Sequence, residues 1–114
     1  NVNSSWLFWI DGGRLRFEIM NDTWRQPSSP NISSDWSLLT GTYHKASAMA
    51  KVYNDGSEFS QKIILNRIEN QNTVKIGKDE HSNNRSINGF IDDLRIYDRA
   101  LSAAEVQALY NLGQ

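Results

Sequence analysis

The first part of the chain alternates apolar and polar residues in a pattern that predicts a β-hairpin. Residues 14–20 place Leu15, Phe17 and Ile19 on one face and charged side chains on the other. Residues 5–10 before them are aromatic and β-prone, and residues 11–13 form an Asp-Gly-Gly turn signal. We therefore predict two antiparallel strands, the second with one buried face and one face in water.

Several more short β-prone segments follow, and turn residues separate them. We predict strands within residues 36–44, 48–54, 55–65 and 72–77, with a hairpin turn at Asn54-Asp55-Gly56. Residues 21–35 contain both prolines and form the longest predicted loop. About seven short strands with almost no helix before residue 100 predict an all-β fold, an antiparallel sandwich or barrel.

The C-terminal residues carry the clearest helix signal. Ser102 is placed as the N-cap and Glu105 follows three residues later, which is a capping box. Val106, Leu109 and Tyr110 recur at i, i+3 and i+4, and a helix of about three turns is too short to be stable alone. We expect this apolar stripe to pack on the sheets.

Residues 87–110 resemble the closing signature of laminin G-like, concanavalin A-like jelly-roll domains. The matching positions are Gly89, Ile91, Asp92, Asp93, Ile96, Tyr97, Arg99, Ala100, Leu101 and Ser102. A looser match in the same order is carried by Trp36, Thr42, Tyr43, Tyr53, Gly56 and Gly77. The resemblance covers about residues 5–112 and implies a concanavalin A-like antiparallel β-sandwich with a short C-terminal helix.

Domains of this family usually run longer and open with strands that pair beside the closing strand. We therefore interpret residues 1–114 as one domain, the C-terminal two-thirds of such a sandwich, incomplete at its N-terminus. A truncated sandwich would leave strand edges and core surface bare. We expect the chain to form a homo-oligomer or to be part of a longer protein.

Charge and composition exclude several classes of partner and site. Twelve basic and thirteen acidic residues nearly cancel and are spread evenly, so no nucleic-acid partner is expected. The absence of cysteine excludes disulfides, thiolate metal sites and a cysteine nucleophile. No apolar run approaches the roughly 20 residues that span a bilayer, so we expect no membrane insertion. The resemblance implies a bacterial protein that is extracellular or attached to the cell surface, with any signal peptide upstream of this chain.

The adjacent acids Asp92 and Asp93 suggest a catalytic or metal-binding pair. In the predicted closing strand, consecutive residues point to opposite faces, so the two carboxylates cannot act on one bond. We interpret Asp92 as a structural residue that anchors the neighbouring loop or chain end, and assign Gly89, Ser102 and Glu105 structural roles as well. The alternative role for Asp92 is calcium binding, with Asp79 and Glu80 as further ligands. Calcium needs about six to eight oxygen ligands, and the sequence does not offer a complete set. We therefore assign no cofactor.

Catalytic patterns are absent from the sequence. Glucanases of this general fold resemble one another through a Glu-x-Asp-x-Glu strand, whereas Met20 stands between Glu18 and Asp22 here. His44 and His81 are isolated and typical of surface residues. We therefore expect no enzymatic activity, and a glycoside hydrolase is the least favoured function.

Carbohydrate binding needs an exposed aromatic face and side chains that bond sugar hydroxyls. One predicted loop offers such a set, Trp24 with Asn21, Asp22 and Arg25, and a second corner is formed by Tyr43 and His44. Trp24 packed on the sandwich edge is the alternative, and the remaining tryptophans, Trp6, Trp9 and Trp36, are expected in the core. We predict non-catalytic binding of an extracellular carbohydrate or protein. The rival is a structural module without a ligand that self-associates through unpaired strand edges.

Overall fold

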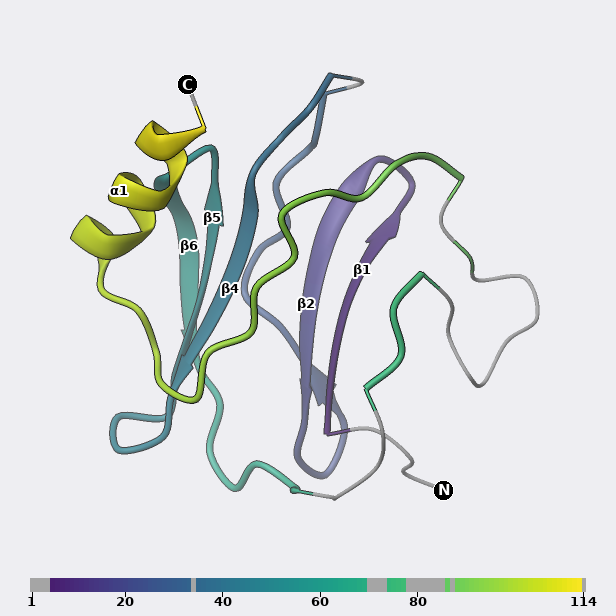
Figure 1. Ribbon diagram of the computed structural model, residues 1–114. Coiled ribbons are helices and arrows are strands. Elements are labelled where there is room, and N and C mark those ends of the chain that lie inside the picture. Colours follow the sequence, from purple (N-terminus) through teal and green to yellow (C-terminus); the bar gives the residue numbers. More distant parts are fainter. Residues whose placement is uncertain (1–4, 34, 70–73, 78–85, 87, 114) are drawn as a thin grey trace.

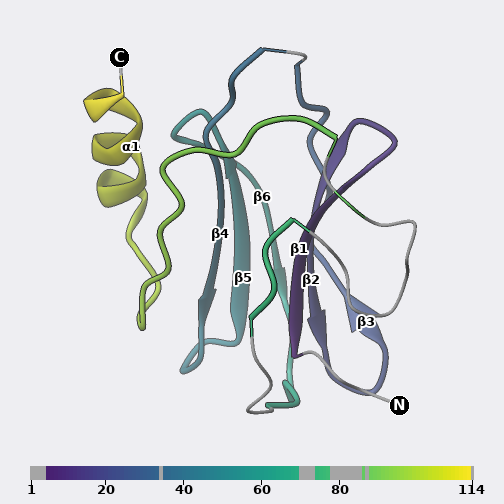
Figure 2. The same ribbon diagram turned by 45° about the vertical axis from the view of Figure 1, so that its right-hand side comes forward.

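Two small antiparallel sheets and one helix make up the fold. The computed structural model describes residues 5–33, 35–69, 74–77, 86 and 88–113. Within these residues the elements are β1 (Trp6–Asp11), β2 (Arg14–Met20), β3 (Trp24–Arg25), β4 (Leu39–His44), β5 (Met49–Asn54), β6 (Ser57–Ile63) and α1 (Ala103–Leu112). The sheets have the orders β1-β2-β3 and β4-β5-β6. They face each other, and α1 lies on the outer side of the second sheet (Figure 1, Figure 2). The fold is a partial concanavalin A-like β-sandwich, which confirms the predicted fold class.

The predicted N-terminal hairpin is present and supplies half of the core. Gly12 and Gly13 have φ angles of 58° and 76°, a left-handed conformation that glycine adopts without a steric penalty. The turn sets the register that places Phe8 opposite Phe17. Leu15, Phe17 and Ile19 are buried against the second sheet, as their alternation predicted.

The second sheet has apolar residues on both faces. Ala50 and Val52 of β5 pack toward β2, whereas Tyr53 packs on the opposite side against Leu101 and Val106. A register shift between Val52 and Tyr53 interrupts the β5–β6 ladder at this point. The second sheet therefore separates the main core from a smaller cluster that attaches α1.

Two predicted strands are not formed. Residues 74–77 and the closing segment 88–98 have no strand, and residues 72–73 lie outside the described part of the chain. A strand is held by a ladder partner, and no backbone hydrogen bond joins either segment to another described residue. Asp93 also has a φ of 51°, which breaks an extended backbone. β3 is a two-residue strand that was not predicted, because it lies within the predicted loop 21–35, so the described residues contain six strands rather than about seven.

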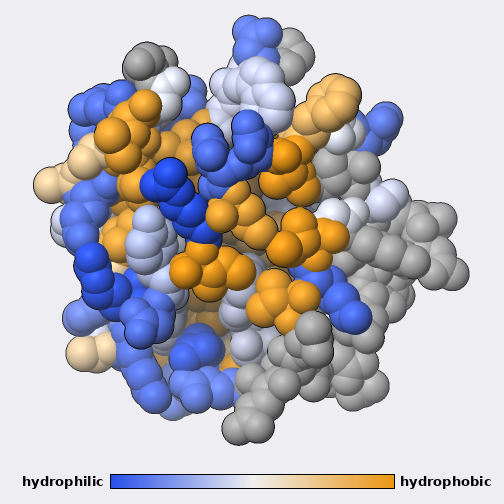
Figure 3. All heavy atoms as spheres, in the orientation of Figure 1, coloured by the Kyte–Doolittle hydropathy of each residue, from blue (hydrophilic) through white to orange (hydrophobic). Residues whose placement is uncertain are grey.

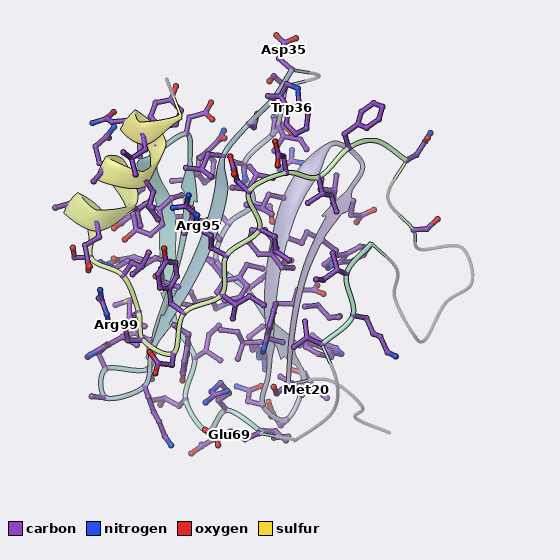
Figure 4. The ribbon with its side chains drawn as sticks, in the orientation of Figure 1. Met20, Asp35, Trp36, Glu69, Arg95 and Arg99 are labelled. Carbon is purple, nitrogen blue, oxygen red and sulfur yellow. The ribbon has the colours of Figure 1, made fainter. Side chains whose placement is uncertain are left out.

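The tryptophans also differ from the prediction. Trp36 was expected in the core, but it lies in the loop before β4 and is 70% exposed. Figure 4 shows Trp36 beside Asp35 at the tip of this loop, away from both sheets. Trp6 is also exposed, and Trp9 is half-buried, with its indole N–H donated to Glu18 over 2.9 Å. None of the three lies in the main core.

Candidate functional site

A groove of 550 Å³ lies on the outer face of the second sheet, beside the start of α1. Cross-strand partners share a face of a sheet, and the pairs Thr42–Lys51 and His44–Met49 place these side chains on the groove floor. Gln61 of β6 pairs with Lys51 and extends the floor. Residues 99–103 and Glu105 form one wall.

The docking of α1 determines where the groove lies. Leu101 and Val106 pack on Tyr53, so the helix covers the part of the outer face near the β5–β6 turn. Gly56 in that turn lets the helix approach closely, because a Cβ there would lie 2.8 Å from the Cβ of Tyr110. The part of the sheet face farther from the turn stays open and becomes the groove floor.

Most charged groups that line the groove are paired. The Arg99 guanidinium donates to both carboxylate oxygens of Glu105, and Lys51 Nζ lies 3.4 Å from Glu58. The hydrogen bonds from Arg99 lower the pKa of Glu105 to about 2, and the carboxylate in turn raises the pKa of Arg99. The groove therefore presents no unbalanced charge from these residues.

The other polar groups of the groove combine donors and acceptors with an apolar side chain. His44 Nδ1 lies 2.9 Å from the Ser47 hydroxyl. Burial raises the pKa of the Tyr53 phenol, which also lines the groove. Gln61 is exposed and lines the groove, so its amide can reach a ligand there. The thioether of Met49 adds an apolar surface.

The four residues of the first predicted site meet at the β2–β3 turn and stay outside the groove. Asn21 accepts a hydrogen bond from the Thr23 N–H and donates one to the Leu65 carbonyl, so its side chain builds the turn. Asp22 and Arg25 lie 3.9 Å apart as an exposed ion pair. Trp24 belongs to β3, pairs with Met20 and is 37% exposed. Figure 4 shows Met20 well apart from Arg99 in the groove wall.

The second predicted corner is split between two faces. Tyr43 points inward, where its hydroxyl donates to the Ile64 carbonyl over 2.7 Å and its ring lies 5.2 Å from the Arg67 guanidinium. His44 points outward and lines the groove. Adjacent strand residues point to opposite faces, so the pair cannot contact one ligand in the groove.

The acids of the closing segment lie in an irregular backbone. Because residues 88–98 form no strand, the opposite-face argument for Asp92 and Asp93 does not apply, and both are exposed. Among described residues, the Asp92 carboxylate accepts a hydrogen bond only from the Asp93 N–H. It anchors no neighbouring loop or chain end within that part. Gly89 is exposed with open space around it.

The predicted capping box is confirmed. The Ser102 hydroxyl accepts from the Glu105 N–H, and the Glu105 carboxylate accepts from the Ser102 N–H. Because the same carboxylate binds Arg99, one side chain joins the start of α1 to the segment before it. Glu105 thus fixes the groove wall.

The part of the chain that the structure describes has neither a cluster of metal-ligating side chains nor a membrane-spanning helix. No cluster there of three or more His, Cys, Asp or Glu residues could hold a metal ion. Asp79, Glu80 and His81 lie outside the described residues. Among the described residues, no helix has the length and apolar character needed to cross a membrane.

Comparison with known proteins assigns the chain to a family. Residues 1–107 match a laminin G family model described as the concanavalin A-like lectin/glucanases superfamily, and the chain belongs to this superfamily. The resemblance of the closing signature is therefore confirmed. A search of curated proteins found no match.

A solved structure shares the fold. It is the crystal structure of an S-layer domain-containing protein from Clostridium thermocellum, with a TM-score of 0.62 and 23% sequence identity. The match covers 86% of this chain and 52% of that chain. This chain therefore spans about half the length of the crystallised relative.

Proposed function

We propose that the protein is a non-catalytic module that binds an extracellular carbohydrate in the groove beside α1. The observation that carries this proposal is the composition of the groove, with neutral hydrogen-bonding groups on an open floor and charged groups that are already paired. Sugar hydroxyls both donate and accept hydrogen bonds, so His44, Ser47 and Gln61 suit them. An extracellular protein segment is the other ligand that this surface would accept.

Two further observations support binding rather than catalysis. The Glu105 carboxylate, with a pKa of about 2, stays ionised near neutral pH and is a poor general acid. Glu58 is paired with Lys51. A retaining or inverting glycosidase needs two carboxyl groups that flank one bond, and neither of these acids is available for that role.

The similarity to an S-layer domain-containing protein supports a location outside the cell. The name of that relative places it among surface-layer proteins, and the family includes lectins. On this basis we infer that the chain acts as an extracellular or cell-surface bacterial module.

Glycan-array binding followed by titration tests the proposed groove. We expect Gln61→Ala to weaken affinity by about fivefold, since a net hydrogen bond contributes about 1 kcal/mol. Gln107→Ala removes the same side chain from α1, outside the groove, and should bind like the parent. Loss of binding on Trp24→Ala with normal binding by the Gln61 variant would move the site to the β2–β3 turn. A parent that binds no glycan would contradict the proposed function.

A second candidate function is a structural module that assembles with copies of itself. The observation that favours it is the exposure of apolar side chains in the closing segment, where Phe90 is 88% and Ile96 61% exposed. Large exposed apolar patches in soluble proteins usually mark interaction sites.

A further inference from the structure

A second pocket, the charged pocket, adjoins the groove at the β4–β5 turn. It has a volume of 340 Å³, and its charged lining residues are Lys45, Arg67 and Glu69. Ser47 of the turn lines both the groove and the charged pocket. In Figure 4, Arg99 of the groove wall and Glu69 both lie toward the end of the second sheet where β4 ends. Figure 3 shows mostly hydrophilic side chains over this end of the sheet, below α1. A ligand in the groove can therefore extend past Ser47 into the charged pocket.

The charges of this pocket do not balance. Lys45 Nζ lies 3.4 Å from Oε1 of Glu69, and the Arg67 guanidinium donates to the same oxygen over 2.5 Å. Two cations thus share one carboxylate, which leaves one positive charge in excess. No other charged residue that the structure describes lines the pocket. The whole chain has a formal net charge of −1, so the positive excess is a local feature.

Arg67 is positioned to hold a second anion. Its guanidinium lies 5.2 Å from the ring of Tyr43, whose hydroxyl is bonded to a backbone carbonyl, and its side chain is only 23% exposed. Glu69 accepts from one terminal nitrogen of this guanidinium, whereas Arg99 uses two nitrogens to pair with Glu105. A guanidinium has five N–H groups, more than one carboxylate oxygen can accept. Arg67 can therefore bind Glu69 and a ligand at the same time.

We propose that the glycan bound in the groove is acidic and that a carboxylate of one of its sugars lies in the charged pocket, against Lys45 and Arg67. The inference rests on the proposed carbohydrate-binding function and names the class of sugar. A planar carboxylate matches the guanidinium fork, and its single negative charge balances the excess of the pocket. The hydroxyls of the next sugar reach Ser47 and the groove floor. A hexuronic acid combines these groups, a carboxylate and ring hydroxyls.

Titration with paired probes tests the class of sugar. Oligosaccharides of glucuronic, galacturonic and mannuronic acid are each compared with their carboxyl-reduced, neutral form. We expect the parent to bind at least one acid about tenfold more tightly than its reduced form, because a charge-assisted hydrogen bond replaces a neutral one. Added salt should weaken binding of the acid and leave the neutral form unaffected.

Two outcomes of this titration are distinct. A parent that binds neutral glycans and prefers no acid over its reduced form would overturn the inference and leave the proposed function standing. A parent that binds no glycan, acidic or neutral, would overturn both.

Charge variants of opposite sign locate the carboxylate. Lys45 and Glu69 are 81% and 55% exposed at their side chains, so their substitution does not disturb the core. Lys45→Gln should weaken binding of the acid about threefold, whereas Glu69→Gln removes the competing carboxylate and should tighten it by a similar factor. Lys62→Gln removes the same charge from an exposed position of β6 outside both pockets and should bind like the parent. Acid binding that both pocket variants leave unchanged, or that Glu69→Gln weakens, would overturn this placement.

Discussion

Gly41 is placed in the middle of β4, where a glycine ordinarily weakens a strand. Its position is explained by the opposite sheet, because the ring of Phe17 packs directly over it. A Cβ at Gly41 would lie 2.8 Å from Cγ of Phe17. The two sheets therefore approach each other at one residue without a side chain.

We expect Gly41→Ala to destabilise the fold by about 1–3 kcal/mol, the usual cost of overpacking a core. Gly89→Ala is the matched control, since Gly89 is exposed with nothing near its added Cβ. Urea denaturation of both variants measures the difference. Equal stability of the two variants would show that the sheets separate easily at Phe17.

At the scale of elements, α1 depends on contacts beyond its own sequence. Its capping box and the Arg99–Glu105 pair fix its first turn, and Val106 attaches it to Tyr53. A helix of this length has little stability alone. The wall of the groove is therefore only as rigid as this attachment.

The pairing of Glu105 makes this attachment depend on pH. The pKa of Glu105 falls from 4.5 to about 2 on folding, so its contribution is present above pH 4.5 and is lost as the pH falls toward 2. We expect the melting temperature of the parent to exceed that of Glu105→Gln above pH 5. The two melting temperatures should converge toward pH 2. A difference that is constant with pH would contradict the assigned pairing.

On the scale of the whole molecule, the two proposed surfaces are separate. The groove uses the outer face of the second sheet, whereas the exposed apolar residues Phe90 and Ile96 of the closing segment do not line it. Arg95 does not line the groove. Figure 4 labels both Arg95 and Arg99, and only Arg99 belongs to the groove wall.

We therefore expect Arg95→Glu to leave glycan affinity within about twofold of the parent. Titration of the variant and the parent at a concentration where both are monomeric measures this independence. Reduced affinity of the monomeric variant would show that the two surfaces are coupled.

The sequence by itself determined five of the six strands of the described residues, their turns and the helix start, and placed the chain in its family. Alternation at Leu15, Phe17 and Ile19, the Gly12–Gly13 turn and the Ser102–Glu105 box are local patterns with local physical causes, so they could be recognised without a structure. Sequence reasoning missed most of the candidate site. It singled out His44 but not Gln61. A polar residue on the outer face of a strand has the same sequence pattern whether or not a groove forms above it. The register of three strands and the docking of α1 built that groove. Only the tertiary structure decided which apolar faces are covered, because burial of Phe8 or Ile96 depends on segments distant in sequence.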